Sequence, residues 1–140
     1  MAEDREPVER LDERECWELL GLAPVGRIAL AAAGEIDIFP INFAVHDGAL
    51  WFRTAPGTKL VELTVNPEVA LEIDGWDAGE AFSVVAKGVA ERVEHGSEID
   101  VAERLPLTPW VPTLKYRWVR IRPRVLSGRR FRRGPEPERY

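Results

Sequence analysis

The sequence predicts a mainly β protein, a small antiparallel β-barrel with a few short helices. About six short runs are apolar or alternate between apolar and polar residues, among them "VGRIALAAA", "ALWFRT" and "AFSVVAKGVAERV". The letters "GE" and "HDG" between such runs are hairpin signals. Helical patterns are few and short, whereas a parallel α/β sheet needs a helix between successive strands. An antiparallel barrel is therefore expected.

The bulk composition indicates one soluble domain. A chain of 140 residues with 45% hydrophobic and 31% charged residues fits a single core. No apolar run approaches the roughly 20 residues that span a bilayer, so we expect no membrane segment. The opening letters "MAEDREPVER" resemble neither a secretory signal nor a transit peptide, which makes the cytoplasm the default location.

Cysteine content and charge argue against two classes of site. Cys16 is the single cysteine and only His46 and His95 could join it, so we expect no disulfide and no metal centre. The net charge of −5 would repel a nucleic-acid backbone, so we expect no nucleic-acid partner. Arginines crowd the C-terminal end, where we interpret them as a solvated strand face and tail.

The sequence predicts three short helices, over residues 12–20, 58–66 and 97–105. Asp12 and Glu15 fit a capping box for the first helix, and Gly21 is expected to end it. Thr58 is the expected cap of the second helix, and Ser97 opens a capping box for the third. These helices are short enough to lie on a sheet rather than to form a layer of their own.

Proline and glycine refine the expected strands. Pro40 lies inside the second of three strands that follow residue 25, and its missing N–H places that strand at an edge or a bulge. Gly88 suggests a bend or a close backbone approach, and the last strand covers residues 115–128. We expect an N-terminal extension, a barrel domain and a flexible tail, over residues 1–10, 11–131 and 132–140.

The stretch "WFRTAPGTKLVEL" predicts an anion site. A helix that begins near Thr58 presents free N–H groups and the positive end of its dipole. Arg53 and Lys59 bracket the turn, and Thr54 and Thr58 add hydroxyl donors, a set that would satisfy a phosphate ester. Alternatively, the two cations are ordinary surface residues beside a capped helix.

The neighbouring strand, "FPINFAV", suits a flat ring with polar edges. Pro40 frees an edge, and Asn42 offers both a donor and an acceptor. Ser83, with its flanking backbone, could contact the same ring, whereas Phe39 and Phe43 are more typical of a core.

At this point the sequence resembles a family. The order "FPINFAV…GALWFRTAPGTKL…AFSVVAKGVAERV…YRWVRIRPRVLSGRRF" is similar to the pyridoxamine 5′-phosphate oxidase-like flavoproteins, and above all to their small bacterial members. The resemblance covers residues 11–131. It implies a six-stranded antiparallel Greek-key split barrel of the FMN-binding type, and a flavin-dependent oxidoreductase that acts on an unknown small molecule.

The resemblance also implies roles for single residues. The segment Pro40, Ile41, Asn42 and Phe43 would line the flavin ring, and Ser83 would contribute from the barrel wall. The ribityl phosphate end would be bound by the remaining matched positions, which are Arg53, Thr54, Thr58 and Lys59. Family members are homodimers, so Trp110 and Arg129 would reach the cofactor of the neighbouring subunit, and Trp76, Trp110 and Trp118 could anchor the dimer.

Departures from the family pattern leave the activity open. The segment "LSGRRF" lacks the Trp and His of the true oxidase, so pyridoxamine oxidation is not expected, and no catalytic residue is assigned. The deazaflavin F420 is the alternative cofactor, because the C-terminal arginines could receive its acidic tail. A flavin carrier without turnover, a cofactor-free interaction domain and an oligonucleotide-binding barrel are the competing functions.

Overall fold

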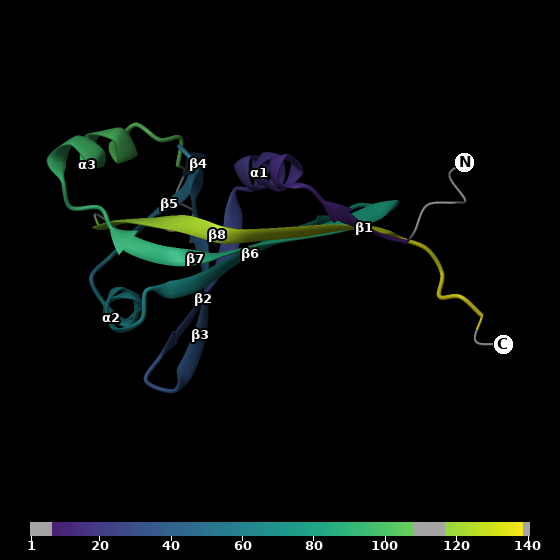
Figure 1. Ribbon diagram of the computed structural model, residues 1–140, viewed down its shortest axis with the longest axis horizontal. Helices are drawn as coiled ribbons and strands as arrows, with labels where there is room; N and C mark the ends of the chain where they lie inside the picture. The colour runs from purple at the N-terminus through teal and green to yellow at the C-terminus, as the bar shows by residue number, and fades with distance from the viewer. Residues whose placement is uncertain (1–6, 108–116, 139–140) are drawn as a thin grey trace.

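The computed structural model describes residues 7–107 and 117–138, with the main chain alone for residues 58, 60 and 61. Strands dominate, as predicted (Figure 1). In chain order the elements are β1 (Val8–Leu11), α1 (Glu13–Leu22), β2 (Val25–Ala32), β3 (Glu35–Asn42), β4 (Ala44–His46), β5 (Ala49–Thr54), α2 (Thr58–Val65), β6 (Glu68–Trp76), β7 (Glu80–Arg92), α3 (Gly96–Glu103) and β8 (Arg117–Arg132).

The strands form one antiparallel sheet in the order β3-β2-β6-β7-β8-β5-β4, with β1 paired to β8. Contacts between β3 and β5 curl the sheet toward a half-closed barrel. The mainly β split-barrel class is confirmed, but a count of six strands is too low for the described residues, which contain eight. The sequence pattern did not indicate β1, and the second expected strand is divided at Phe43, where consecutive Phe43 and Ala44 are both buried and the alternation breaks.

Helix α1 begins as the capping box predicted. The Asp12 carboxylate accepts a 2.8 Å hydrogen bond from the Glu15 N–H, and the Glu15 carboxylate accepts one from the Asp12 N–H. The expected end at Gly21 is wrong, because the helix continues to Leu22. Pro24 ends it instead, since the residue before a proline avoids the helical conformation, and Ala23 is extended.

The expected caps of the other two helices are also wrong. Gly57 is the N-cap of α2 and makes no side-chain cap, so Thr58 is the first helical residue instead of the cap. Helix α3 begins at Gly96 with His95 as its N-cap, which places Ser97 within the first turn. The N–H groups of the first turn of α2 therefore donate no hydrogen bond to an N-cap side chain.

The long strand β8 crosses the molecule from beneath α3 to β1 (Figure 1). It continues past the expected end at residue 128 to Arg132, while residues 115 and 116 lie outside the described part. Gly88 does mark a close approach, because a Cβ there would lie 2.1 Å from the Arg122 carbonyl oxygen beside a register shift. Edge position is likewise confirmed for the strand that holds Pro40, since β3 ends the sheet.

Two apolar clusters hold the sheet. The main core lies inside the curl, where β2, β6 and β7 contribute Ile28, Leu71 and Val84, all essentially unexposed. The second cluster lies on the other face under α3, where Ala102 of the helix packs with Trp51 of β5 and Trp118 of β8. Trp118 is therefore buried within its own chain and is not available as a dimer anchor.

The outer face of the sheet beyond α3 keeps its side chains exposed or half-buried, and we call it the open face. The register aligns its residues in rows across the strands, since directly opposite residues point to the same side. One row contains Ile38, Ala29, Ala70, Lys87 and Val125, the next contains Pro40, Arg27, Glu72, Val85 and Ser127, and a third contains Asp74, Ser83, Arg129 and Arg10. Within the described residues, no helix has the length and apolar character needed to cross a membrane.

Candidate functional site

Arg53 is the most unusual cation of the predicted anion site. It lies opposite Trp118 in the β5–β8 ladder, and its guanidinium carbon is 5.4 Å from the centroid of the indole ring. Its Nε atom is buried and has no hydrogen-bond partner among the described residues. A buried N–H donor without an acceptor is costly, so the described residues leave the hydrogen-bonding capacity of this Nε unused.

Arg120 provides the comparison on the same two strands. It lies opposite Trp51, with its guanidinium carbon 5.0 Å from that ring. It also contacts two carboxylates at 2.8 Å, Glu91 through Nε and Glu98 through Nη1. Each of the two arginines lies against its own tryptophan ring, but only Arg120 also contacts carboxylates among the described residues.

Lys59 lies in the first turn of α2 and approaches β3. Its ammonium nitrogen is 5.0 Å from the centroid of the Phe39 ring, which packs against the main core, so Lys59 approaches β3 on the face opposite to the Pro40 side chain. The start of α2 adds backbone N–H groups without a side-chain cap. The structure therefore joins the helix start to the strand that was predicted to hold a ring. The Thr58 side chain is outside the description.

The predicted hydroxyl donor on β5 points away from Arg53. Thr54 is only 5% exposed, and its hydroxyl group donates a 3.2 Å hydrogen bond to the carbonyl oxygen of Ala55. Neighbouring residues of a strand face opposite sides, so Arg53 and Thr54 do not share a surface.

The segment from Pro40 to Phe43 divides between surface and core. Pro40 is exposed, while Ile41 and Phe43 are each 5% exposed and belong to the main core. Asn42 donates a 3.0 Å hydrogen bond from Nδ2 to the Pro24 carbonyl oxygen. Phe43 also lines a cavity of about 240 Å³ between the end of α1 and β4. Side-chain contacts to a ring would thus come from Pro40 and Asn42, and other contacts from the backbone.

Ser83 and Arg129 are directly opposite each other in the β7–β8 ladder, on the open face. Arg129 is eleven residues beyond Trp118 in β8, and a strand rises about 3.3 Å per residue, so roughly 35 Å of strand separates them. The structure therefore places Arg129 far from Arg53 along the strand of one chain. Trp110 lies outside the described residues.

Helix α2 docks on β2 and β3 through side chains at helical spacing. One turn after Lys59, Glu62 faces Asp37 of β3, and Asn66, just after α2, donates a 2.7 Å hydrogen bond to the Ala31 carbonyl oxygen of β2. The hydrogen bond to Asp37, then burial, then the charges of Asp37 and Glu35 raise the pKa of Glu62. Protonation of this pair therefore favours the docked helix.

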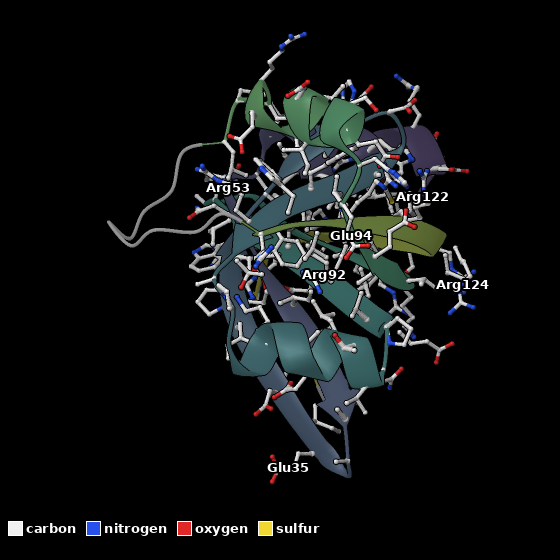
Figure 2. The ribbon with its side chains drawn as sticks, turned by 90° about the vertical axis from the view of Figure 1, so that its left-hand side faces the viewer. Glu35, Arg53, Arg92, Glu94, Arg122 and Arg124 are labelled. Atoms are coloured by element: carbon white, nitrogen blue, oxygen red, sulfur yellow. The ribbon has the colours of Figure 1, made fainter. Side chains whose placement is uncertain are left out.

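Sequence reasoning missed the two aromatic supports. Phe39 was interpreted as a core residue, and it does pack against the main core, but its ring also lies against Lys59. Trp118 was interpreted as a dimer anchor, and its ring lies against Arg53. The register of β5 against β8 pairs Arg53 with Trp118, and no local pattern encodes that register. Figure 2 shows Arg53 on the opposite side of the view from Arg122 and Arg124, which belong to other charge clusters.

Comparisons with known proteins agree with this architecture. The family model described as pyridoxamine 5′-phosphate oxidase matches residues 12–130. A solved structure from Corynebacterium glutamicum, named provisionally as a pyridoxamine 5′-phosphate oxidase, is 44% identical, with a TM-score of 0.86 over 94% of this chain and 98% of that one.

Two mycobacterial proteins are also similar. An FAD-binding protein from Mycobacterium smegmatis is 38% identical, with a TM-score of 0.75 over 88% of this chain and 97% of its own. An uncharacterised protein of Mycobacterium tuberculosis is 42% identical over 95 residues, which is 68% of this chain and 86% of that protein. The extent of the family match and these identities show that the chain belongs to the pyridoxamine 5′-phosphate oxidase family.

Proposed function

We propose that this protein binds a flavin, with FMN as the first candidate, and that it is a flavin-dependent oxidoreductase acting on a small molecule. The observation that carries the proposal is the buried Nε of Arg53, which lacks a hydrogen-bond partner among the described residues. Arg120, which lies in the Trp51–Arg120 pair of the same ladder, has an equivalent aromatic support in Trp51 and also contacts two carboxylates at 2.8 Å. The missing anion at Arg53 fits a phosphate supplied by a ligand.

The donors around Arg53 suit the phosphate of a ribityl chain. An arginine offers a planar fork and a lysine a point charge, and the uncapped first turn of α2 adds N–H groups and a favourable dipole. Arg53 and Lys59 come from the two sides of one short loop, so a ligand placed at that loop can meet both. Thr58 stays a candidate donor through its place at the helix start.

The ring would lie against β3. Within the described residues β3 pairs only with β2, so one edge of its backbone has no strand partner. Pro40 lacks an N–H, while Ile41, Asn42 and Phe43 offer backbone groups beside it. A bound flavin supplies hydride or electron transfer at its own ring, and the protein orients it and excludes water.

The identity of the flavin is the finer part of the proposal. The Mycobacterium smegmatis relative is named as an FAD-binding protein, which supports a flavin. FMN and FAD both carry a phosphate on the ribityl chain, so Arg53 and Lys59 suit either one. F420 remains the alternative cofactor, and a carrier without turnover remains the alternative function.

A homodimer would complete the site. The open face exposes Ile38 and Val125 by 65% and 56%, and it also holds the ion pair of Arg27 with Glu72 at 2.6 Å. Apolar and paired charged residues on one face suit a twofold interface. Across such an interface Ser83 and Arg129 would approach the partner's flavin, which they cannot reach within one chain.

Mass measurement by light scattering tests this assembly. We expect a dimer for the wild type and a monomer for Val125→Asp, because a buried unpaired carboxylate at the interface is costly. Val101→Asp on α3 is the matched control, since Val101 is 38% exposed away from the open face. A dimer that survives Val125→Asp and a further Ile38→Asp change would contradict this interface.

Visible absorption tests the cofactor. We expect the purified protein to show or acquire the two bands of an oxidised flavin when FMN or FAD is added, and the double change Arg53→Ala, Lys59→Ala to abolish them. The double change Arg92→Ala, Arg124→Ala is the control, because it removes equal charge from exposed pairs at 3.8 and 3.2 Å. Equal flavin binding by both double variants would refute the phosphate site.

Turnover separates the enzyme from the carrier. The enzyme predicts that NADH, NADPH or reduced F420 bleaches the bound flavin and that a small electrophile restores it faster than oxygen does. A flavin that stays oxidised with each reductant would favour the carrier.

A further inference from the structure

The indole of Trp118 is held in one orientation by its surroundings. It is 4% exposed, and its Nε1–H donates a 2.9 Å hydrogen bond to the carboxylate of Glu103 at the end of α3. Its backbone carbonyl oxygen accepts a 3.0 Å hydrogen bond from Val93, just beyond β7. Packing against Ala102 and Trp51 completes the enclosure. The ring therefore presents a fixed face to its neighbour on β5.

That neighbour is Arg53, at 5.4 Å from guanidinium carbon to ring centroid, within the range of a cation–π interaction. Among the described residues, this guanidinium has no carboxylate partner, and its aromatic partner is the Trp118 ring. A free arginine side chain has many rotamers, and ordering it on binding costs affinity. A rigid ring beneath it removes part of that cost before the ligand arrives.

We propose that Trp118 is the positioning residue for Arg53, and that it sets the preference of the site for phosphorylated flavins over riboflavin. This inference rests on the proposed function. Riboflavin has the same ring and ribityl chain as FMN and lacks only the phosphate. A residue that acts through Arg53 on the phosphate must change FMN affinity and leave riboflavin affinity in place.

Glu103 acts one step further out. Its carboxylate accepts the indole N–H, which fixes the ring and increases electron density in it, and both effects strengthen attraction for a cation. Glu103 itself is exposed, so its replacement does not open the core. Helix α3 thereby influences the flavin phosphate through one hydrogen bond and one ring.

The test compares dissociation constants of FMN and riboflavin, measured by quenching of flavin fluorescence, in Trp118→Leu and Trp51→Leu. Trp51 is the matched control: it is 3% exposed, lies in the same cluster and supports Arg120. We expect Trp118→Leu to weaken FMN binding about three- to thirtyfold and riboflavin binding little, from the usual strength of a cation–π contact. Trp51→Leu should keep the wild-type ratio of the two constants.

Milder variants guard against misfolding of Trp118→Leu. Trp118→Phe keeps a ring and should retain most of the preference, and Glu103→Ala should narrow it in an otherwise intact core. If the wild type prefers FMN while Trp118→Leu keeps the wild-type ratio, or Glu103→Ala keeps it, the inference is wrong and the proposed function stands. If the wild type binds FMN no more tightly than riboflavin, the phosphate site and this inference both fall.

Discussion

Two arginines on neighbouring strands differ in their interaction partners. Arg120 and Arg53 each lie across a ladder from a tryptophan, at 5.0 and 5.4 Å from the ring. Arg120 binds Glu91 and Glu98, whereas Arg53 has a buried Nε with no hydrogen-bond partner in the described part of the chain. Arg120 and its two carboxylates stabilise the fold, whereas Arg53 has the aromatic support without a carboxylate among the described residues. That difference is the basis of the proposal that Arg53 binds the flavin phosphate.

The largest expected effect comes from removing Arg120, the arginine that has carboxylate partners. Arg120→Ala leaves Glu98 without this cation and Glu91 with Arg122 alone, and the Arg120 side chain is 12% exposed, so we expect a loss of about 1–3 kcal/mol of unfolding free energy. Without flavin, Arg53→Ala should change it by less than about 0.5 kcal/mol. Urea unfolding measures both. Equal losses would remove the contrast between the two arginines.

Flavin should reverse the order of the two positions. At an FMN concentration about 100 times its dissociation constant, the wild type gains about 2.7 kcal/mol of stability. Arg53→Ala loses a charge-assisted hydrogen bond worth about 1.5–3 kcal/mol, so most of that gain should vanish at the same concentration. Thermal melting with and without FMN checks this, with Arg124→Ala as the control. An undiminished gain in Arg53→Ala would contradict the phosphate assignment.

Of the two arginines, only Arg120 should lose stabilising contacts at acidic pH, because only Arg120 is paired with a carboxylate among the described residues. Partial burial alone would raise the pKa of Glu91, but hydrogen bonds from Arg122 and Arg120 outweigh it and hold that pKa below its usual value. The contribution is therefore present above the ordinary carboxyl pKa of about 4.3 and is lost as the pH falls through the lowered value.

Glu91→Gln tests this directly. Urea unfolding between about pH 5 and pH 3 should show a shallower loss of stability in Glu91→Gln than in the wild type, because the variant has no carboxylate to protonate there. Arg53→Ala should keep the wild-type slope. A Glu91→Gln slope as steep as that of the wild type would show that Arg120 gains nothing from this anion.

The smallest expected effect concerns the docking of α2, the helix that carries Lys59, the second cation of the predicted anion site. The pKa of Glu62 is raised, so its contribution to stability is complete below the ordinary carboxyl value and is lost as the pH rises through the raised value. Glu62→Gln copies the protonated form, and its melting temperature should exceed that of the wild type at neutral pH and equal it at low pH. Glu94→Gln on an exposed site is the control. A lower melting temperature at neutral pH would contradict the repulsion between Glu62 and Asp37.

The same comparison explains what the sequence could predict. Local signals identified the class of the sheet, the capping box of Asp12, the edge position of Pro40 and the close approach at Gly88, since each depends on neighbours in the chain or on a single residue type. The turn with Arg53 and Lys59 was also recognisable as a cluster of donors. Helix ends were missed where Pro24 and Gly57, rather than the nearest good cap, decided them.

The features that the sequence did not predict depend on the register between strands. Trp118 and Arg53 are 65 positions apart, and their contact arises because β5 pairs with β8 in one particular alignment. Slipping that alignment by one residue would turn the indole into the main core. A single sequence gives no direct information about such long-range pairing, so the support beneath Arg53 was invisible although both residues were noticed. The division of one expected strand at Phe43 has the same origin, because the chain changes partner strand there.

The most direct test of the central claim is the ¹H–¹⁵N NMR signal of the Arg53 Nε–H, followed while FMN is added. Arg120 provides an internal reference in the same spectrum, because its Nε–H already donates to Glu91 at 2.8 Å. We predict that the Arg53 signal moves and becomes protected from solvent exchange with FMN but not with riboflavin, while the Arg120 signal stays in place. FMN binding that leaves the Arg53 signal unchanged would contradict the account.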